Sequence, residues 1–224
     1  MTKEQLEELI KELAAAEMVE KSTDGGIKQD PGIGPVTVDV KQIQDAVDSA
    51  VAAGLTPLII DTSEQHIVDT FFGYNAVMVD AKQLSLNVAM KKMTKEAALE
   101  KARTQLVAAL QGGRTMVVAC QQGAPSFNDW FDAPGSWPLG AIMARGGKGY
   151  TVDKSPLPEA VMRDEDTARH SGFAVVDPKF ATVVTSWFSP GDYEEFLFDE
   201  GKGPLGSVGR EAFRVIIATN ESGE

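Results

Sequence analysis

Short apolar segments rich in β-branched residues alternate with longer amphipathic segments through the middle of this 224-residue chain. The segments that read as strands are residues 36–40, 56–61, 75–80 and 114–120. The segments whose apolar spacing predicts helices are residues 41–54, 64–74 and 94–113. Strands separated by helices pair in parallel, because each helix carries the chain back before the next strand begins. The sequence therefore predicts an α/β fold with a mainly parallel central sheet flanked by helices.

Further segments with the composition of strands follow in the C-terminal third of the chain. They are residues 173–177, 180–188, 194–199 and 213–220. The connections between them are short and contain the turn sequences PGDY and GKGPLG. Because short turns of this kind join antiparallel strands, we expect antiparallel pairing in this part of the chain.

The predicted organisation is an N-terminal helix at 1–20, a linker at 21–35, an α/β domain at 36–220 and a tail at 221–224. The N-terminal helix is amphipathic, and either packs on its own domain or is offered to a partner. Within the domain the regular pattern stops at about residue 121 and resumes at about 172. This irregular insertion is rich in glycine and proline, and a stretch of this length is commonly functional.

The chain carries 33 acidic and 21 basic residues, which gives a net charge of -12. A surface of this charge repels polyanions on average, so we expect neither nucleic-acid binding nor attachment to anionic membranes. No apolar run reaches the length of about 18 residues that a transmembrane helix needs. A single cysteine cannot form an internal disulfide, which favours a reducing compartment. These features predict a cytoplasmic protein.

The turn after the strand at 56–61 stands where many nucleotide-binding α/β proteins hold phosphate. A phosphate-binding P-loop needs glycines, so that backbone N–H groups can approach the ligand, and a lysine. This turn instead reads TSEQH (62–66), and the carboxylates of Asp61 and Glu64 would repel phosphate. The segment GGKGYT at 146–151 lacks the first glycine of the motif and reads as a loop. The sequence therefore predicts no loop suited to triphosphate hydrolysis.

The segments PLIID, VMVD, LVAALQGGRTMVVA and FRVIIATN occur in an order that resembles the nucleotide-pocket core of AAA+-type modules. The chain is most similar to the late, non-hydrolysing modules of the dynein heavy-chain motor, over residues 56–120 and 212–220. The resemblance implies a P-loop-like three-layer sandwich. It also implies a cytoskeletal or ciliary setting.

The resemblance implies few working catalytic residues. The strand whose end should carry an acidic pair for Mg²⁺ ends in Ala119, Cys120 and Gln121. Asn220 stands where such modules carry a sensor asparagine. The chain is therefore expected to be a pseudo-ATPase, which is a non-catalytic, degenerate nucleotide-binding-like module. It would need no cofactor and would act as a protein-interaction or scaffold element.

Two other functions stay open. One is a regulatory binder of ATP or ADP, whose pocket would be formed by Thr62, Ser63, Arg114 and Asn220. The other is a hydrolase or transferase that uses Cys120 as nucleophile, with His66 or His170 as base. A lone cysteine also commonly serves as a small core residue. The cysteine and the two histidines are too dispersed to predict a metal site.

Aromatic residues gather in the irregular insertion. They are Phe127, Trp130, Phe131 and Trp137. Exposed aromatic side chains make good anchors for a partner protein, so these residues are the predicted partner-binding surface. The alternative that they fold back over the edge of the sheet also stays open.

Overall fold

The computed structural model describes residues 34–123, 133, 135–143, 161–199 and 203–220. All of these belong to one compact unit that begins at Ile33. The predicted N-terminal helix and most of the linker lie outside the described residues, as do the GGKGYT loop and Phe127, Trp130 and Phe131. Among the described helices, none combines the length and the apolar character needed to cross a bilayer.

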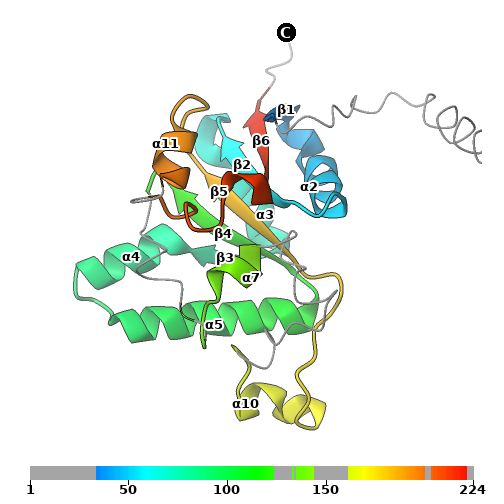
Figure 1. Cartoon of the computed structure of the whole chain (residues 1–224), viewed down its shortest axis with the longest axis vertical. Coiled ribbons are helices and arrows are strands. Elements are labelled where there is room, and N and C mark those ends of the chain that lie inside the picture. The colour runs from blue at the N-terminus through cyan, green and yellow to red at the C-terminus, as the bar shows by residue number, and fades with distance from the viewer. Residues whose placement is uncertain (1–33, 124–132, 134, 144–160, 200–202, 221–224) are drawn as a thin grey trace, which may run out of the picture. The chain divides into compact units, whose positions relative to one another are not determined.

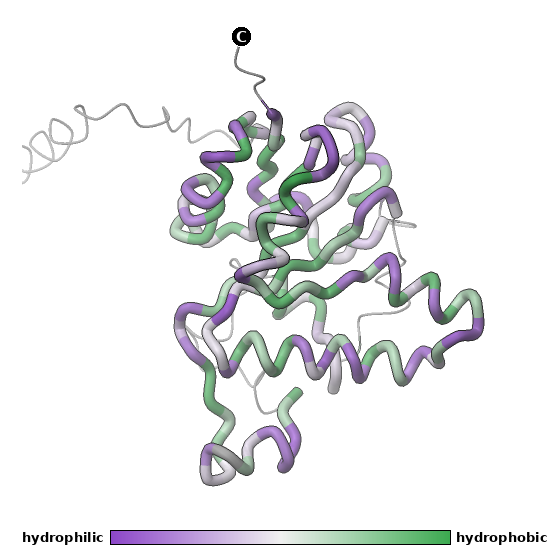
Figure 2. The backbone as a smooth tube through the Cα atoms, turned by 180° about the vertical axis from the view of Figure 1, so that it is seen from behind, coloured by the Kyte–Doolittle hydropathy of each residue, from purple (hydrophilic) through white to green (hydrophobic). Residues whose placement is uncertain are grey.

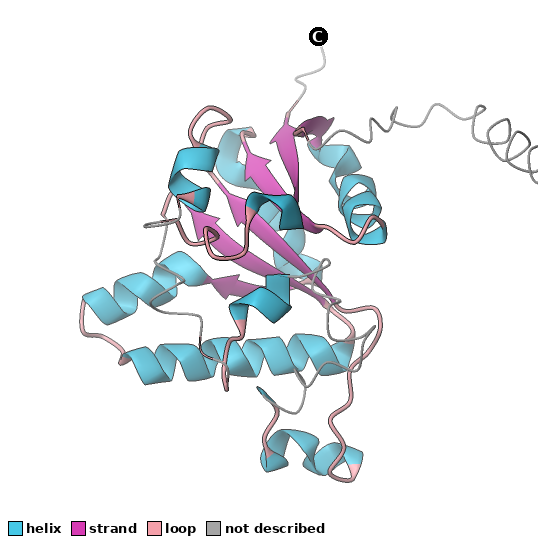
Figure 3. Cartoon of the chain, viewed as in Figure 1, coloured by secondary structure: helices cyan, strands magenta, loops and turns pink. Residues whose placement is uncertain are grey.

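A six-stranded sheet forms the centre of the described unit, and every strand in it runs parallel to its neighbours. In chain order the strands are β1 (Val36–Asp39), β2 (Thr56–Asp61), β3 (Val77–Asp80), β4 (Thr115–Gln121), β5 (Ala181–Ser186) and β6 (Phe213–Thr219). Their order across the sheet is β1-β6-β2-β5-β4-β3, and Figure 3 shows the arrows pointing the same way. The predicted α/β fold with a mainly parallel sheet is confirmed.

Helices cover both faces of this sheet (Figure 1). The α-helices are α2 (Ile43–Ala52), α3 (Ile67–Asn75), α4 (Ala81–Ala89), α5 (Lys95–Gly112), α7 (Leu139–Met143), α10 (Asp164–Thr167) and α11 (Tyr193–Phe198). Short 3-10 helices are η1 (Val40–Gln42), η2 (Glu64–His66), η4 (Ala168–His170) and η5 (Arg210–Ala212).

Strand β2 shows how the two faces are divided. Leu58 and Ile60 point into a core shared with α4, α5, α7 and α11. Ile59 points the other way, into a core shared with α2 and α3. A strand that is apolar on both sides is what a sheet covered on both faces requires. Figure 2 accordingly shows hydrophobic strands, whereas hydrophobic and hydrophilic residues alternate along the long helix α5.

Helix α5 begins and ends where its local sequence predicts. The Thr94 side chain accepts a hydrogen bond from the Ala97 backbone N–H at 3.2 Å, which caps the first turn. Gly113 ends the helix with a left-handed φ of 59°. A Cβ atom at Gly113 would also meet the carboxyl group of Asp177, which would have to move aside.

The C-terminal expectations were partly wrong. Strand β5 pairs parallel with β2 and β4, and β6 pairs parallel with β1 and β2, so the expected antiparallel pairing does not occur. Residues 173–177 form no strand, and Phe173 is 71% exposed. The predicted strand at 194–199 is helix α11 instead. Glu194 and Glu195 lie in its first turn, where the helix dipole favours carboxylates, and Tyr193 and Leu197 bury one helical face.

The expected irregular insertion contributes to the core. Trp137 is 0% exposed and packs with Leu139, Ile142 and Met143 of α7 in the core that covers α5. Its backbone N–H and carbonyl pair with Ala133 in an isolated antiparallel bridge. The prediction that Trp137 anchors a partner is therefore wrong, because an indole without exposed surface cannot contact one. The alternative in which it folds over the sheet holds for this residue.

Candidate functional site

The connections of β2 and β5 define the place where a ligand pocket is expected. After β2 the chain enters α3, which packs on one face of the sheet, whereas after the neighbouring β5 it enters α11 on the other face. The two connections therefore diverge above the carboxyl ends of adjacent strands. In open parallel sheets this divergence leaves a crevice in which ligands bind.

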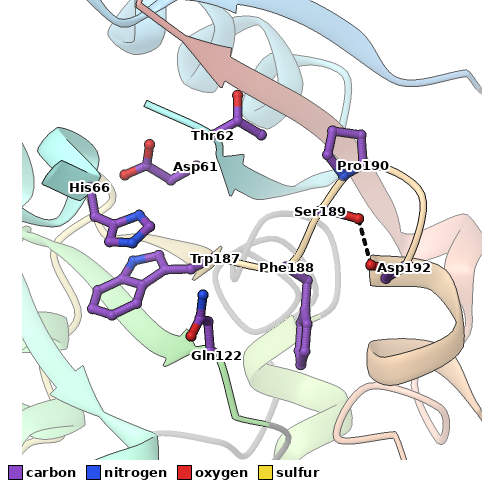
Figure 4. A pocket seen from close by; sticks show the side chains of 9 residues that line it. All are labelled: Asp61, Thr62, His66, Gln122, Trp187, Phe188, Ser189, Pro190 and Asp192. Atoms are coloured by element: carbon purple, nitrogen blue, oxygen red, sulfur yellow. Dashed lines mark hydrogen bonds between the residues drawn. The ribbon is translucent and has the colours of Figure 1, made fainter. Parts of the chain in front are cut away.

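A pocket of about 630 Å³ occupies this crevice (Figure 4). Three loops line it, and each follows the carboxyl end of a strand. Asp61 ends β2 and Thr62 and His66 follow it in the next loop, whereas Gln122 comes from the loop after β4. The loop after β5 contributes Trp187, Phe188, Ser189, Pro190 and Asp192. The pocket is thus built from residues more than a hundred positions apart in the sequence.

The loop after β2 is organised around the buried carboxylate of Asp61. Its Oδ1 accepts hydrogen bonds from the Ser63 backbone N–H at 2.9 Å and from the Ser63 hydroxyl at 2.5 Å. Its Oδ2 accepts from the Val68 N–H at 3.1 Å, and the Ser63 Oγ accepts from the Ile67 N–H at 3.1 Å. The first two N–H groups of α3, those of Ile67 and Val68, are therefore already satisfied by the chain itself. In a phosphate loop such groups remain available to the ligand.

Three of the five described non-glycine residues with a left-handed φ lie in or beside the loops that form the pocket. Gln65, His66 and Gln121 have left-handed φ values of 65°, 51° and 52°. Non-glycine residues adopt this conformation only where the surrounding structure enforces it, and they cluster at functional sites. The conformation of His66 places its ring parallel to the Trp187 indole, with the centroids 4.0 Å apart and an interplanar angle of 2°. Its Nδ1 is buried and has no hydrogen-bond partner among the described residues.

The Trp187 side chain also forms a hydrogen bond with Asp69 of α3. The Asp69 carboxylate accepts from the Trp187 Nε1 at 3.0 Å and from the Thr185 hydroxyl at 2.7 Å. Burial raises the pKa of Asp69, the two hydrogen bonds oppose that rise, and the nearby carboxylates of Asp61 and Asp80 add to it. The stacked His66 ring on one face of the indole and the hydrogen bond at its N–H together fix the orientation of Trp187 in the wall of the pocket.

Of the four proposed nucleotide-binding residues, only Thr62 lines the pocket. Its hydroxyl and its backbone N–H both donate to the Ala218 carbonyl, at 2.8 and 3.0 Å. Ser63 is buried against Asp61, and Asn220 is exposed just beyond β6; neither lines the pocket.

Arg114 lies at the opposite edge of the sheet from Thr62. It precedes β4, and its Nη2 donates to the Ala76 carbonyl at 3.1 Å. The amino and carboxyl ends of parallel strands occupy opposite edges, so the prediction that Arg114 shares a pocket with Thr62 is wrong.

Cys120 does not have the surroundings of a nucleophile. It is 0% exposed, and burial raises the pKa of its thiol to about 12, with a further contribution from the carboxylates of Asp69 and Asp80. His66 stacks on Trp187 instead of facing the thiol. His170 ends η4, in a segment held to the C-terminal end of α5 by a hydrogen bond from Gln111 to the Asp166 carbonyl, and so lies near the amino edge of the sheet. The structure does not assemble the cysteine–histidine pair.

We expect Cys120 to react slowly with iodoacetamide at neutral pH. The thiolate is the reactive form, so a thiol with so high a pKa should be alkylated at least about a hundredfold more slowly than in the unfolded chain. Mass spectrometry over time measures this directly, and the same protein in denaturant is the control. Rapid stoichiometric alkylation of the folded protein would instead support the cysteine-enzyme hypothesis.

Among the described residues, no group of three or more His, Cys, Asp or Glu side chains is arranged to hold a metal ion. Comparison with models of known protein families, with curated proteins and with solved structures finds no match for this chain.

Sequence reasoning missed Asp69, Gln122 and the loop after β5 as parts of the site. A signal for them was present, since polar and aromatic residues follow β5 directly in the sequence WFSPGD (187–192). That signal was hidden by the expectation of antiparallel strands. Only a parallel β5 brings Trp187 to the same edge of the sheet as His66.

Proposed function

We propose that this protein is a non-catalytic, P-loop-like module that holds no phosphate and acts as a protein-interaction or scaffold element. One observation carries the proposal. The Asp61 carboxylate occupies, in the loop after β2, the N–H groups with which a phosphate loop would bind its ligand. A second anion at that place would meet a buried carboxylate that already accepts the Ser63 and Val68 N–H groups.

The chemistry around the other strand ends supports the same proposal. The described residues that line the pocket include the carboxylates of Asp61 and Asp192, and no lysine or arginine. Phosphoryl transfer depends on cations that offset the charge of the phosphates. The end of β4 carries Ala119, Cys120 and Gln121, none of which can hold Mg²⁺ through a carboxylate. We therefore favour a binding role over hydrolysis.

The setting belongs to the proposal as well. A relationship to the late, non-hydrolysing modules of the dynein motor would place the protein in the cytoplasm, in a cytoskeletal or ciliary complex. The net charge of -12 favours a protein partner over nucleic acid. A regulatory ATP or ADP site is the second candidate. The pocket lies where the connections after β2 and β5 diverge, and nucleotides bind at such places in parallel sheets.

Thermal unfolding with nucleotide separates the two candidates. We expect ATP and ADP at millimolar concentration, with Mg²⁺ or with chelator, to move the unfolding midpoint by less than about 1 °C. A nucleotide present at about a hundred times its dissociation constant would stabilise by about 2.7 kcal/mol and move the midpoint by several degrees. Sulfate at matched ionic strength controls for general salt effects. A shift specific to nucleotide would replace the scaffold role by that of a nucleotide sensor.

A further inference from the structure

We propose that the pocket at the carboxyl edge of the sheet binds an organic cation, namely an ammonium or guanidinium group carried on an apolar stem. This inference rests on the proposed function, since it names the kind of group that a non-catalytic binding module would receive there. Three properties of the pocket support it: its charge, its hydrogen-bonding groups and its aromatic wall.

The charge of the pocket is negative. Asp61 and Asp192 line it, Asp69 accepts the Trp187 N–H, and the described lining residues include no lysine or arginine that would offset these carboxylates. The walls are partly apolar, so charges near them are screened less than on an open surface. A cation gains from this field, whereas phosphate or carboxylate ligands are repelled by it.

The hydroxyl groups of Thr62 and Ser189 in the pocket already donate hydrogen bonds within the protein. Thr62 donates to the Ala218 carbonyl at 2.8 Å, and Ser189 donates to the Asp192 carboxylate at 2.6 Å. A hydroxyl has one proton and two lone pairs, so each oxygen is left to act as an acceptor. The Ser189 Oγ uses one lone pair for the Gly191 N–H at 3.3 Å and keeps the other. The ligand that matches such a lining is rich in N–H donors.

The remaining wall suits the apolar stem of such a ligand. Trp187, Phe188 and Pro190 contribute apolar surface to the lining of the pocket (Figure 4). The Trp187 N–H is used by Asp69 and one face of the ring is covered by His66, so the indole offers the pocket its remaining ring surface and no donor. Aromatic rings beside carboxylates are the combination with which proteins recognise alkylammonium and guanidinium groups.

The proposal is tested by titrating the whole chain with small probes and monitoring the indole N–H signals in NMR spectra. The probes are n-butylammonium and methylguanidinium, with n-butanol as the neutral isostere and butyrate as the anion, all at constant ionic strength. We expect the Trp187 signal, assigned with Trp187→Phe, to shift saturably with the cations, with a dissociation constant on the order of millimolar. The neutral isostere should bind at least about fivefold more weakly.

Charge-matched variants show whether the pocket itself is responsible. Asp192→Asn should weaken binding of the cations about fivefold, because it removes an exposed carboxylate at the rim. Asp164→Asn removes the same charge from the exposed start of α10 and should leave the affinity unchanged. Equal binding of n-butanol, binding of butyrate, or equal effects of the two variants would overturn the proposal.

Short capped peptides containing lysine or arginine identify the source of the cation. Tighter binding of these peptides than of the free amines would assign the pocket to a basic side chain of a partner protein, and the reverse order to a free amine; both results support the proposed chemistry. The two proposals fail separately. A nucleotide-dependent rise in the unfolding midpoint overturns the proposed function, whereas loss of cation binding without that rise overturns only the present inference.

Discussion

Replacing Trp137 by alanine should lower the free energy of unfolding by about 3–5 kcal/mol. The indole is 0% exposed and belongs to the core to which α5 and α7 also contribute. Its removal therefore leaves a cavity too large for its neighbours to fill. Urea denaturation followed by circular dichroism measures the loss. The midpoint should fall while the slope stays constant, since the variant changes stability and not the surface exposed on unfolding.

Tyr74→Ala is the matched control for Trp137→Ala. Tyr74 is also aromatic, but it lies near the end of α3 and is 81% exposed, so its removal should change the free energy of unfolding by less than about 0.5 kcal/mol. If Trp137→Ala were as mild as Tyr74→Ala, the indole would not belong to the core. The prediction that it anchors a partner would then have to be restored.

The second large effect is expected from Arg103→Met, which should lower the free energy of unfolding by about 2–3 kcal/mol. The guanidinium is 2% exposed and holds the segment after residue 160 against α5. Its Nη1 donates to the Val161 carbonyl at 2.8 Å and to the Asp166 carboxylate at 2.5 Å, and its Nη2 donates to Glu100 at 2.8 Å. Methionine fills a similar volume and makes none of these bonds, so the acceptors around it lose their buried donor.

The penalty for Arg103→Met should depend on pH, because its partners are carboxylates. The hydrogen bond from Arg103 is the largest cause of the lowered pKa of Glu100. Burial acts to raise the pKa of Asp166, but hydrogen bonds from the Arg163 backbone and from Arg103 outweigh it, and that pKa is lowered too. A carboxyl group whose pKa is lowered by folding stabilises the fold above its unfolded value and loses that contribution as the pH falls through its folded value.

Denaturation between pH 7 and pH 3 tests this dependence. The difference between the native protein and Arg103→Met should be largest near neutral pH and should shrink below the unfolded values, which are 4.5 for Glu100 and 3.8 for Asp166. Arg163→Met is the control, since Arg163 is 50% exposed, bonds to the same Glu100, and should cost less than about 1 kcal/mol. A penalty that does not change with pH would mean that Arg103 acts by packing alone.

Much of the fold could be predicted from local pattern. Strand β2 is apolar at every position from Pro57 to Ile60, which only a sheet covered on both faces permits, and α5 carries its own cap at Thr94 and its own end at Gly113. The same local pattern misled at 173–177 and 194–199. Short apolar and aromatic segments have the same composition in strands, helices and loops, and their partners in space decide between these states.

The chemistry of the loop after β2 could also be predicted, because the lack of glycine and lysine and the presence of Asp61 are visible in the sequence itself. Those facts already argued against a phosphate site. They did not reveal the hydrogen bonds of the Asp61 carboxylate, which accepts from the N–H groups of Ser63 and Val68. That arrangement depends on how the loop folds, and the loop is held in place by β6 through Thr62.

The pocket itself is a product of tertiary structure. Sequence alone determined the kind of sheet and the chemistry of one loop, since both follow from residues close together in the chain. The direction and order of the strands decided the rest. Once β5 runs parallel beside β2, Trp187 meets His66 and Asp69 at the carboxyl edge, and Arg114 is left at the other. Contacts between residues more than a hundred positions apart leave no local pattern from which they can be inferred.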